Sequence, residues 1–169
     1  METERLKLAP WGEDDIAGLR AMAIDPEVVR YISDGVPWPE ERVREFFERQ
    51  RRLYAERGYC MWRLSDKIGD GEVIGFCGIQ PLGQTGEIEI GWWLAKAYWG
   101  RGLATEAARC ALADAFERVG LQRVVAIARE ANRASTRIME KLGMQFEKRM
   151  EHRGVKVVLY AVERDSPMR

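Results

Sequence analysis

Residues 91–107 decide the fold of this chain, and their sequence is Gly91-Trp92-Trp93-Leu94-Ala95-Lys96-Ala97-Tyr98-Trp99-Gly100-Arg101-Gly102-Leu103-Ala104-Thr105-Glu106-Ala107. The stretch passes from a predicted strand through a glycine-containing turn into a predicted helix. Such a turn exposes backbone N–H groups at the positive end of the helix dipole, an arrangement that binds pyrophosphate. Gly100 and Gly102 permit unusual dihedrals and close phosphate approach, and Arg101 could add a charge-assisted contact. The sequence therefore predicts a phosphate-binding turn here.

Other kinds of glycine turn fit this stretch less well. A P-loop requires Lys and Ser or Thr after its last glycine, whereas Gly102 is followed by Leu103 and Ala104. A dinucleotide fingerprint requires a third glycine at position 105, which is Thr105, within a repeated βαβ pattern. A pair of loop glycines that binds no ligand stays open as an alternative.

The overall composition indicates a soluble, intracellular globular protein. The 169 residues and 19.4 kDa suit one compact domain over 1–169, and 27 basic residues balance 27 acidic ones. This balance favours neither nucleic acid nor an anionic membrane as a partner. Cys60, Cys77 and Cys110 lack zinc-ligand spacing, so no metal site is expected. The sequence starts without a secretory signal and has no membrane-spanning apolar run, which predicts a soluble cytoplasmic protein.

The flanking pattern predicts a mixed α+β chain. Alternation and turn residues indicate a first strand at 5–11, an antiparallel meander at 59–65, 72–80 and 87–94, a strand at 123–129, and a tail hairpin at 145–149 and 155–164. Apolar stripes indicate helices at 13–24, 25–32, 39–57, 103–119 and 135–142. Gly58 and Gly120 are expected to end two of these helices.

Three segments in order resemble the GNAT acetyltransferases. Their phosphate loop follows an x-x-x-Gly-x-Gly/Ala pattern, which Trp99-Gly100-Arg101-Gly102-Leu103-Ala104 matches with Ala104 in the last place. The start at residues 3–8, with Pro10-Trp11, is similar to the ribosomal-protein N-terminal acetyltransferase subgroup. The stretches at residues 132–135 and 140–144 are similar to that subgroup as well. Together the matches span nearly the whole chain.

The resemblance implies a fold and an activity. The fold would be a central twisted, mostly antiparallel sheet with helices on both faces. The activity would be transfer of an acetyl group from acetyl-CoA to a primary amine by direct attack in a ternary complex, without a metal. The acceptor would be a protein or peptide N-terminus or a small-molecule amine, and the analogy allows a homodimer. The alternatives are a catalytically weak CoA-binding or sensing module of the same fold and a nucleotide-binding domain.

The resemblance also implies where the co-substrate binds. Acetyl-CoA would sit in a V-shaped gap between the strands at 87–94 and 123–129, with its pantetheine arm paired to backbone like an added strand. Asn132 would contact the arm or orient the thioester. The expected binding residues, which span both strand ends, the turn and the last helix, are Trp92, Trp93, Leu94, Trp99, Gly100, Arg101, Gly102, Leu103, Ala104, Thr105, Asn132 and Ser135.

Catalysis requires a base, an oxyanion donor and a route for a proton to the thiolate. Glu89 is the preferred base, Glu87 is the fallback on the same strand face, and both could instead be exposed carboxylates. A backbone N–H near Trp93 would stabilise the oxyanion. The tyrosine that usually supplies the proton is replaced by Met139, so Ser135 is the candidate donor; it could equally be the N-cap of its helix.

Several other residues have structural interpretations. Glu106 is expected to cap its helix, His152 to be a bystander and Cys110 to pack. The tryptophans Trp38, Trp62, Trp92 and Trp93 could line an acceptor pocket or belong to the core.

Overall fold

The computed structural model of the chain describes residues 1–32 and 34–165. Within them the strands are β1 (Leu6–Ala9), β2 (Met61–Asp66), β3 (Gly75–Pro81), β4 (Ile88–Leu94), β5 (Arg123–Ala128), β6 (Gln145–His152) and β7 (Val155–Glu163). The helices are α1 (Ile16–Ala23), α2 (Pro26–Val29), α3 (Glu40–Arg57), α4 (Leu103–Glu117) and α5 (Arg133–Lys141), with short 3-10 turns at Glu13–Asp15 and Lys96–Tyr98.

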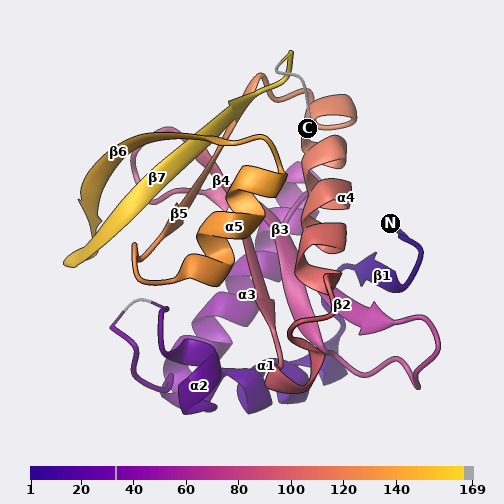
Figure 1. Cartoon of the computed structure of the whole chain (residues 1–169). Coiled ribbons are helices and arrows are strands. Elements are labelled where there is room, and N and C mark those ends of the chain that lie inside the picture. The colour runs from indigo at the N-terminus through magenta and orange to yellow at the C-terminus, as the bar shows by residue number, and fades with distance from the viewer. Residues whose placement is uncertain (33, 166–169) are drawn as a thin grey trace.

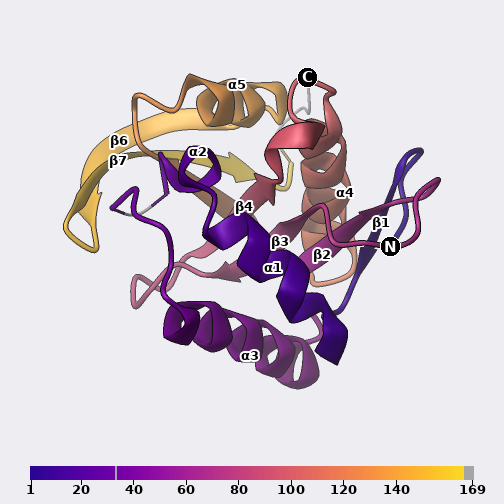
Figure 2. The same ribbon diagram turned by 90° about the horizontal axis from the view of Figure 1, so that it is seen from below.

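The described strands form one sheet in the order β1-β2-β3-β4-β5-β7-β6. Every neighbouring pair is antiparallel except β4 and β5, so the predicted meander and the mostly antiparallel sheet are confirmed. Figure 2 shows α1 and α3 on one face of the sheet and α4 and α5 on the other. The expected GNAT fold, with helices on both faces, is therefore present.

The parallel pair β4–β5 divides this sheet. Its register contains a single Cα pair, Glu89 with Val125, whereas β4 pairs with β3 over its whole length and β5 pairs with β7 likewise. Beyond this point the two strands separate, and the loops at their ends lead into α4 and α5 (Figure 1). The sheet thus consists of two antiparallel halves that meet near Glu89 and open towards the N-termini of two helices.

Local sequence signals place most helix ends. Asp25 caps α2 by accepting a hydrogen bond from the Glu27 backbone N–H at 2.9 Å, ahead of Pro26 at the first helical position. Gly58 ends α3 with a φ of 71°. The predicted α-helix over 13–24 begins instead with a 3-10 turn, because Asp15 turns back to accept from the Gly12 N–H at 2.6 Å.

A close backbone contact holds β2 against β3 inside the meander. A Cβ atom at Gly78 would lie 2.0 Å from the carbonyl oxygen of Cys60 and 2.9 Å from the Cα of Met61. Both distances are shorter than folded proteins tolerate, and neither neighbour is a flexible side-chain end. Only glycine fits at this crossing.

We therefore predict that Gly78→Ala lowers the free energy of unfolding by at least about 2 kcal/mol, because the added methyl group forces the strands apart. Gly69→Ala is the matched control, since its Cβ would meet its nearest neighbour at 3.7 Å. Urea unfolding of both variants measures the difference. Equal midpoints for the two variants would contradict the prediction.

Candidate active site

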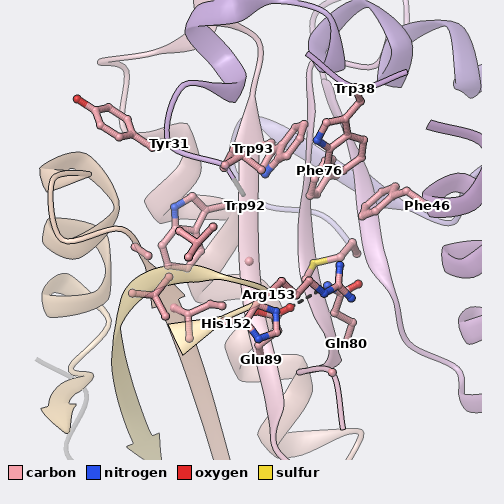
Figure 3. Close-up of a pocket in the computed structure, with 18 of the residues that line it drawn as sticks. Tyr31, Trp38, Phe46, Phe76, Gln80, Glu89, Trp92, Trp93, His152 and Arg153 are labelled. Atoms are coloured by element: carbon pink, nitrogen blue, oxygen red, sulfur yellow. Dashed lines mark hydrogen bonds between the residues drawn. The ribbon is translucent and has the colours of Figure 1, made fainter. Parts of the chain in front are cut away.

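A cavity of about 800 Å³ opens where β4 and β5 separate. Its wall combines α3, β3, β4, the end of β5, the start of α5 and the β6–β7 turn. Figure 3 shows the wall, with Glu89 and Gln80 on one side and an aromatic group at the other end. The cavity therefore lies over the junction of the two halves of the sheet.

Glu89 is held at the cavity wall by a chain of amide side chains. The Met61 N–H donates to Gln50 Oε1 at 2.9 Å, Gln50 Nε2 donates to Gln80 Oε1 at 2.7 Å, and Gln80 Nε2 donates to Glu89 Oε1 at 2.8 Å. Gln50 is fully buried, so the chain starts in the core and ends in the cavity. One carboxylate oxygen of Glu89 is thereby fixed.

The surroundings of Glu89 have opposite effects on the pKa of its carboxyl group. Burial raises the pKa of its carboxyl group above the ordinary 4.5, against smaller lowering effects of the Gln80 hydrogen bond and the charges of Arg153 and Arg49. His152 lines the same cavity, and its own pKa is lowered by burial and by Arg153. The interpretation of Glu89 as a merely exposed carboxylate is wrong.

Glu87 is not in the cavity wall. Its carboxylate accepts from Arg123 Nε at 3.2 Å, and Arg123 also binds Glu147 at 2.7 Å and Glu163 at 2.9 Å. The side chain thus joins an ion-pair cluster that ties β5 to β6 and β7. The fallback role of Glu87 as base is therefore wrong.

Asn132 and Ser135 lie together where α5 starts, and both line the cavity. Asn132 Oδ1 accepts from the Ser135 N–H at 3.2 Å, and Asn132 Nδ2 donates to Ser135 Oγ at 3.3 Å. Asn132 is therefore the N-cap, and the interpretation of Ser135 as the cap is wrong. Met139 is 1% exposed in the core, which leaves Ser135 as the hydroxyl of α5 that faces the cavity near its end.

Aromatic side chains close the far end of the cavity. Trp93 packs on Trp38 with a centroid distance of 4.7 Å and on Phe76 at 5.0 Å, and Phe46 lies 5.0 Å from Phe76 (Figure 3). Trp38, Trp92 and Trp93 line the cavity, as one of the sequence interpretations holds. Trp62 is instead buried, packs on Tyr54 of α3 and does not line the cavity, so its pocket role is wrong.

The glycine turn lies beyond the cavity, at the start of α4. Gly100 and Gly102 have φ angles of 71° and 78°, which explains why both positions are glycine. Trp99 Nε1 donates to the Leu94 carbonyl at 2.8 Å, which ties the turn to the end of β4 and occupies one acceptor of Leu94. Binding of phosphate by residues 99–105 stays a prediction.

Glu106 does not cap α4. Its carboxylate accepts from Thr3 Oγ1 at 2.5 Å and from the Arg5 N–H at 2.9 Å, and it forms an ion pair with Arg5 Nη2 at 2.6 Å. Burial raises its pKa, but these bonds outweigh it and leave the pKa below the usual range. Arg5 Nη1 in turn donates to the Arg101 carbonyl at 2.9 Å. Glu106 and Arg5 therefore hold the glycine turn in place through its backbone.

The comparisons with known proteins agree with this geometry. The sequence model described as "Acetyltransferase (GNAT) domain" matches residues 5–145. The chain belongs to the GNAT acetyltransferase family. It is accordingly an acetyl-CoA-dependent N-acetyltransferase that uses acetyl-CoA as its co-substrate.

Several relatives resemble the chain over most of its length. YkkB of Bacillus subtilis strain 168, an uncharacterised protein, is 32% identical over 94% of this chain and 92% of its own. YnaD of the same strain, named as an uncharacterised N-acetyltransferase, is 29% identical over 86% of this chain and 82% of its own. An acetyltransferase structure from Agrobacterium tumefaciens C58 superposes with a TM-score of 0.84 at 27% identity, covering 96% of this chain and 93% of that one.

Residues 1–32 and 34–165 hold neither a metal-ion cluster nor a membrane-spanning helix. These residues contain no group of three or more His, Cys, Asp or Glu side chains arranged to hold a metal ion. Nor does any helix in this part of the GNAT chain have the length and apolar character needed to cross a membrane.

Sequence reasoning missed four side chains of the site. Gln50 and Gln80 orient Glu89, whereas Arg49 and Arg153 bring positive charge to it. His152, expected as a bystander, lines the cavity because the hairpin turn folds over it. The charge periodicity of α3 gave no signal for Arg49, since arginines on both faces of that helix look alike in sequence.

Because Glu106 and Arg5 support the glycine turn, we predict that Glu106→Gln weakens acetyl-CoA binding about two- to tenfold, the range for a supporting group. Unfolding free energy should fall by about 1 kcal/mol, since Arg5 is partly exposed and screened. Titration calorimetry of acetyl-CoA measures the affinity. Lys7→Ala on the exposed side of β1 is the control, and unchanged affinity in Glu106→Gln would contradict the supporting role.

Proposed function

We propose that this enzyme transfers the acetyl group directly from acetyl-CoA to a primary amine while both substrates occupy the cavity. The observation that carries the proposal is the position of Glu89, at the single point where β4 pairs with β5 and in the wall of the cavity. A base at this point reaches whatever lies in the gap between the strands. The acceptor is a peptide N-terminus or a small-molecule amine.

The co-substrate fits the open side of the sheet. Past Glu89 the backbone of β4 has no strand partner towards β5, so the backbone at Trp92 and Trp93 can pair with the pantetheine arm. The carbonyl of Leu94 is already engaged by Trp99, which restricts that pairing to the preceding residues. Backbone N–H groups of residues 100–105 hold the pyrophosphate at the start of α4. Asn132, fixed by its bonds to Ser135, contacts the arm from α5.

The reaction then uses three groups of the chain. Glu89 accepts a proton from the ammonium form of the acceptor, directly or through a water, and the neutral amine attacks the thioester carbonyl carbon. A backbone N–H next to Trp93, on the side of β4 that faces the gap and not β3, stabilises the developing oxyanion. As the C–S bond breaks, the attacking nitrogen loses its second proton, and this proton reaches the leaving sulfur through the Ser135 hydroxyl or a water. The amide and the CoA thiol are released, and Glu89 returns its proton to solvent.

The first test of this role is Glu89→Gln. The variant keeps the shape of the side chain but cannot accept the proton, so we expect kcat to fall about 10²- to 10⁴-fold. Release of the CoA thiol in the presence of an accepted amine gives the rate. Acetyl-CoA affinity should stay within about twofold, and a rate within threefold of wild type would show that another group is the base.

The pH profile tests the environment of Glu89. Because burial raises its pKa, the acid limb of kcat/KM should lie above pH 4.5. Gln80→Met removes the hydrogen bond that favours the ionised form, so the limb should move to still higher pH. An unchanged limb in Gln80→Met would contradict the assignment of that limb to Glu89.

The same pKa shift has a consequence for stability. A carboxyl group whose pKa is raised by folding binds its proton more tightly in the folded state, so its contribution to stability falls as pH rises above 4.5. Glu89→Gln removes this loss. We expect the variant to melt at the same or a higher temperature than wild type at pH 7, and a clearly lower melting temperature would argue against a raised pKa.

A further inference from the structure

Two arginines face the proposed base from opposite sides of the cavity. Arg49 comes from α3 and Arg153 from the β6–β7 turn, and both line the cavity with Glu89. Their charges both lower the pKa of Glu89. Figure 3 shows Arg153 beside Glu89 and Gln80. Two cations therefore converge on one carboxylate whose pKa is raised by burial.

Neither guanidinium group forms a direct ion pair with a described carboxylate, although the charges of Glu89 and Glu45 act on Arg49. Within residues 1–32 and 34–165 no carboxylate oxygen lies within 4.0 Å of either guanidinium, and Arg49 rests over the Phe46 ring at 5.3 Å. Partial loss of hydration and the like charge of Arg153 lower the pKa of Arg49, against smaller raising effects of Glu89 and Glu45, and both arginine side chains stay exposed to solvent at the cavity. The cavity thus carries local positive charge that an anionic ligand would complement.

The backbone of Arg153 adds an independent observation. Its φ is 50°, and among the described residues it is the only non-glycine with a positive φ. A two-residue hairpin turn of this kind favours Asn-Gly, whereas this chain has Arg153-Gly154. The turn itself requires a positive φ at this position, and an arginine there, in place of the usual asparagine or glycine, is uncommon.

We propose that the acceptor is an apolar amino acid or a similar amine that carries a carboxylate next to the amino group. Arg49 and Arg153 bind the carboxylate by charge-assisted hydrogen bonds, which places the amine beside Glu89. The apolar side chain lies towards Phe46 and Trp93 in the aromatic end of the cavity. This assignment rests on the proposed function, because it takes Glu89 as the base.

The same charges disfavour other acceptors. A polyamine would bring further positive charge between Arg49 and Arg153, and the repulsion between like charges would weaken its binding. A plain alkylamine would leave the guanidinium groups without a partner. The affinity of the enzyme for an amine should therefore depend on the presence of the carboxylate more than on the size of the apolar group.

Binding to the enzyme saturated with CoA tests the proposal without turnover. L-Phenylalanine is compared with 2-phenylethylamine, and L-leucine with 3-methylbutylamine, by titration calorimetry. Each carboxylate-bearing amine should bind at least about tenfold more tightly than its partner. The variants Arg49→Gln and Arg153→Asn should reduce this ratio to below about threefold; asparagine suits the left-handed turn and so preserves the hairpin.

Arg52→Gln, an exposed position on α3 outside the cavity wall, is the matched control and should keep the wild-type ratio. Three results would overturn the proposal. They are equal binding within each pair, no saturable binding of either amino acid, and an affinity ratio that is unchanged in the Arg49→Gln/Arg153→Asn double variant. Failure of the proposed function differs from this result, because it would appear as no thiol release with any amine although acetyl-CoA binds.

Discussion

The separation of β4 from β5 is the constraint on which the rest of the molecule depends. Each strand is fully paired on its other side, so the two halves of the sheet are stable without a continuous ladder between them. Their one shared pair, at Glu89 and Val125, leaves the following backbone groups of β4 free towards the gap. Backbone groups require hydrogen-bond partners, and in the proposed binding mode an extended acyl carrier supplies them. A fully zipped sheet would have no such site.

The elements around this gap have separate roles. In the proposed mechanism the β4 side and the start of α4 provide backbone groups for the co-substrate, whereas α3 and the β6–β7 turn, which line the cavity, provide side chains for the acceptor. Glu89 lies between these two sets. Its orientation comes from Gln50 and Gln80 and its charge balance from Arg49 and Arg153, so the base is controlled by the acceptor side of the cavity. Chemistry and acceptor selection therefore use the same few residues.

Local signals made the fold predictable from sequence. The strand meander, the alanine stripe of α4 and the turn glycines are short-range patterns, and the glycine turn with its neighbours also indicated the family. Most of what failed was set by long-range contacts. Glu106 looks like a helix cap until Arg5, 101 residues earlier, is placed beside it. Ser135 and Asn132 are both good caps, so propensity could not choose between them. Arg49 and Arg153 meet only when α3 and the hairpin fold over the same strand.

The most direct test of the account is the thermal shift produced by acetyl-CoA, with NAD and ATP as controls. Acetyl-CoA at about 100 times its dissociation constant adds about 2.7 kcal/mol, which is a rise of several degrees for a domain of this size. We expect this rise for wild type and for Gly86→Asp, but not for Gly100→Asp. The Gly100→Asp variant places a carboxylate where the pyrophosphate is proposed to bind. Gly86 and Gly100 both have positive φ, and a Cβ on either would meet no described atom within 4 Å, so they form a matched pair. An equal rise in Gly100→Asp, or none in wild type, would contradict the assignment of the gap and the glycine turn as the acetyl-CoA site.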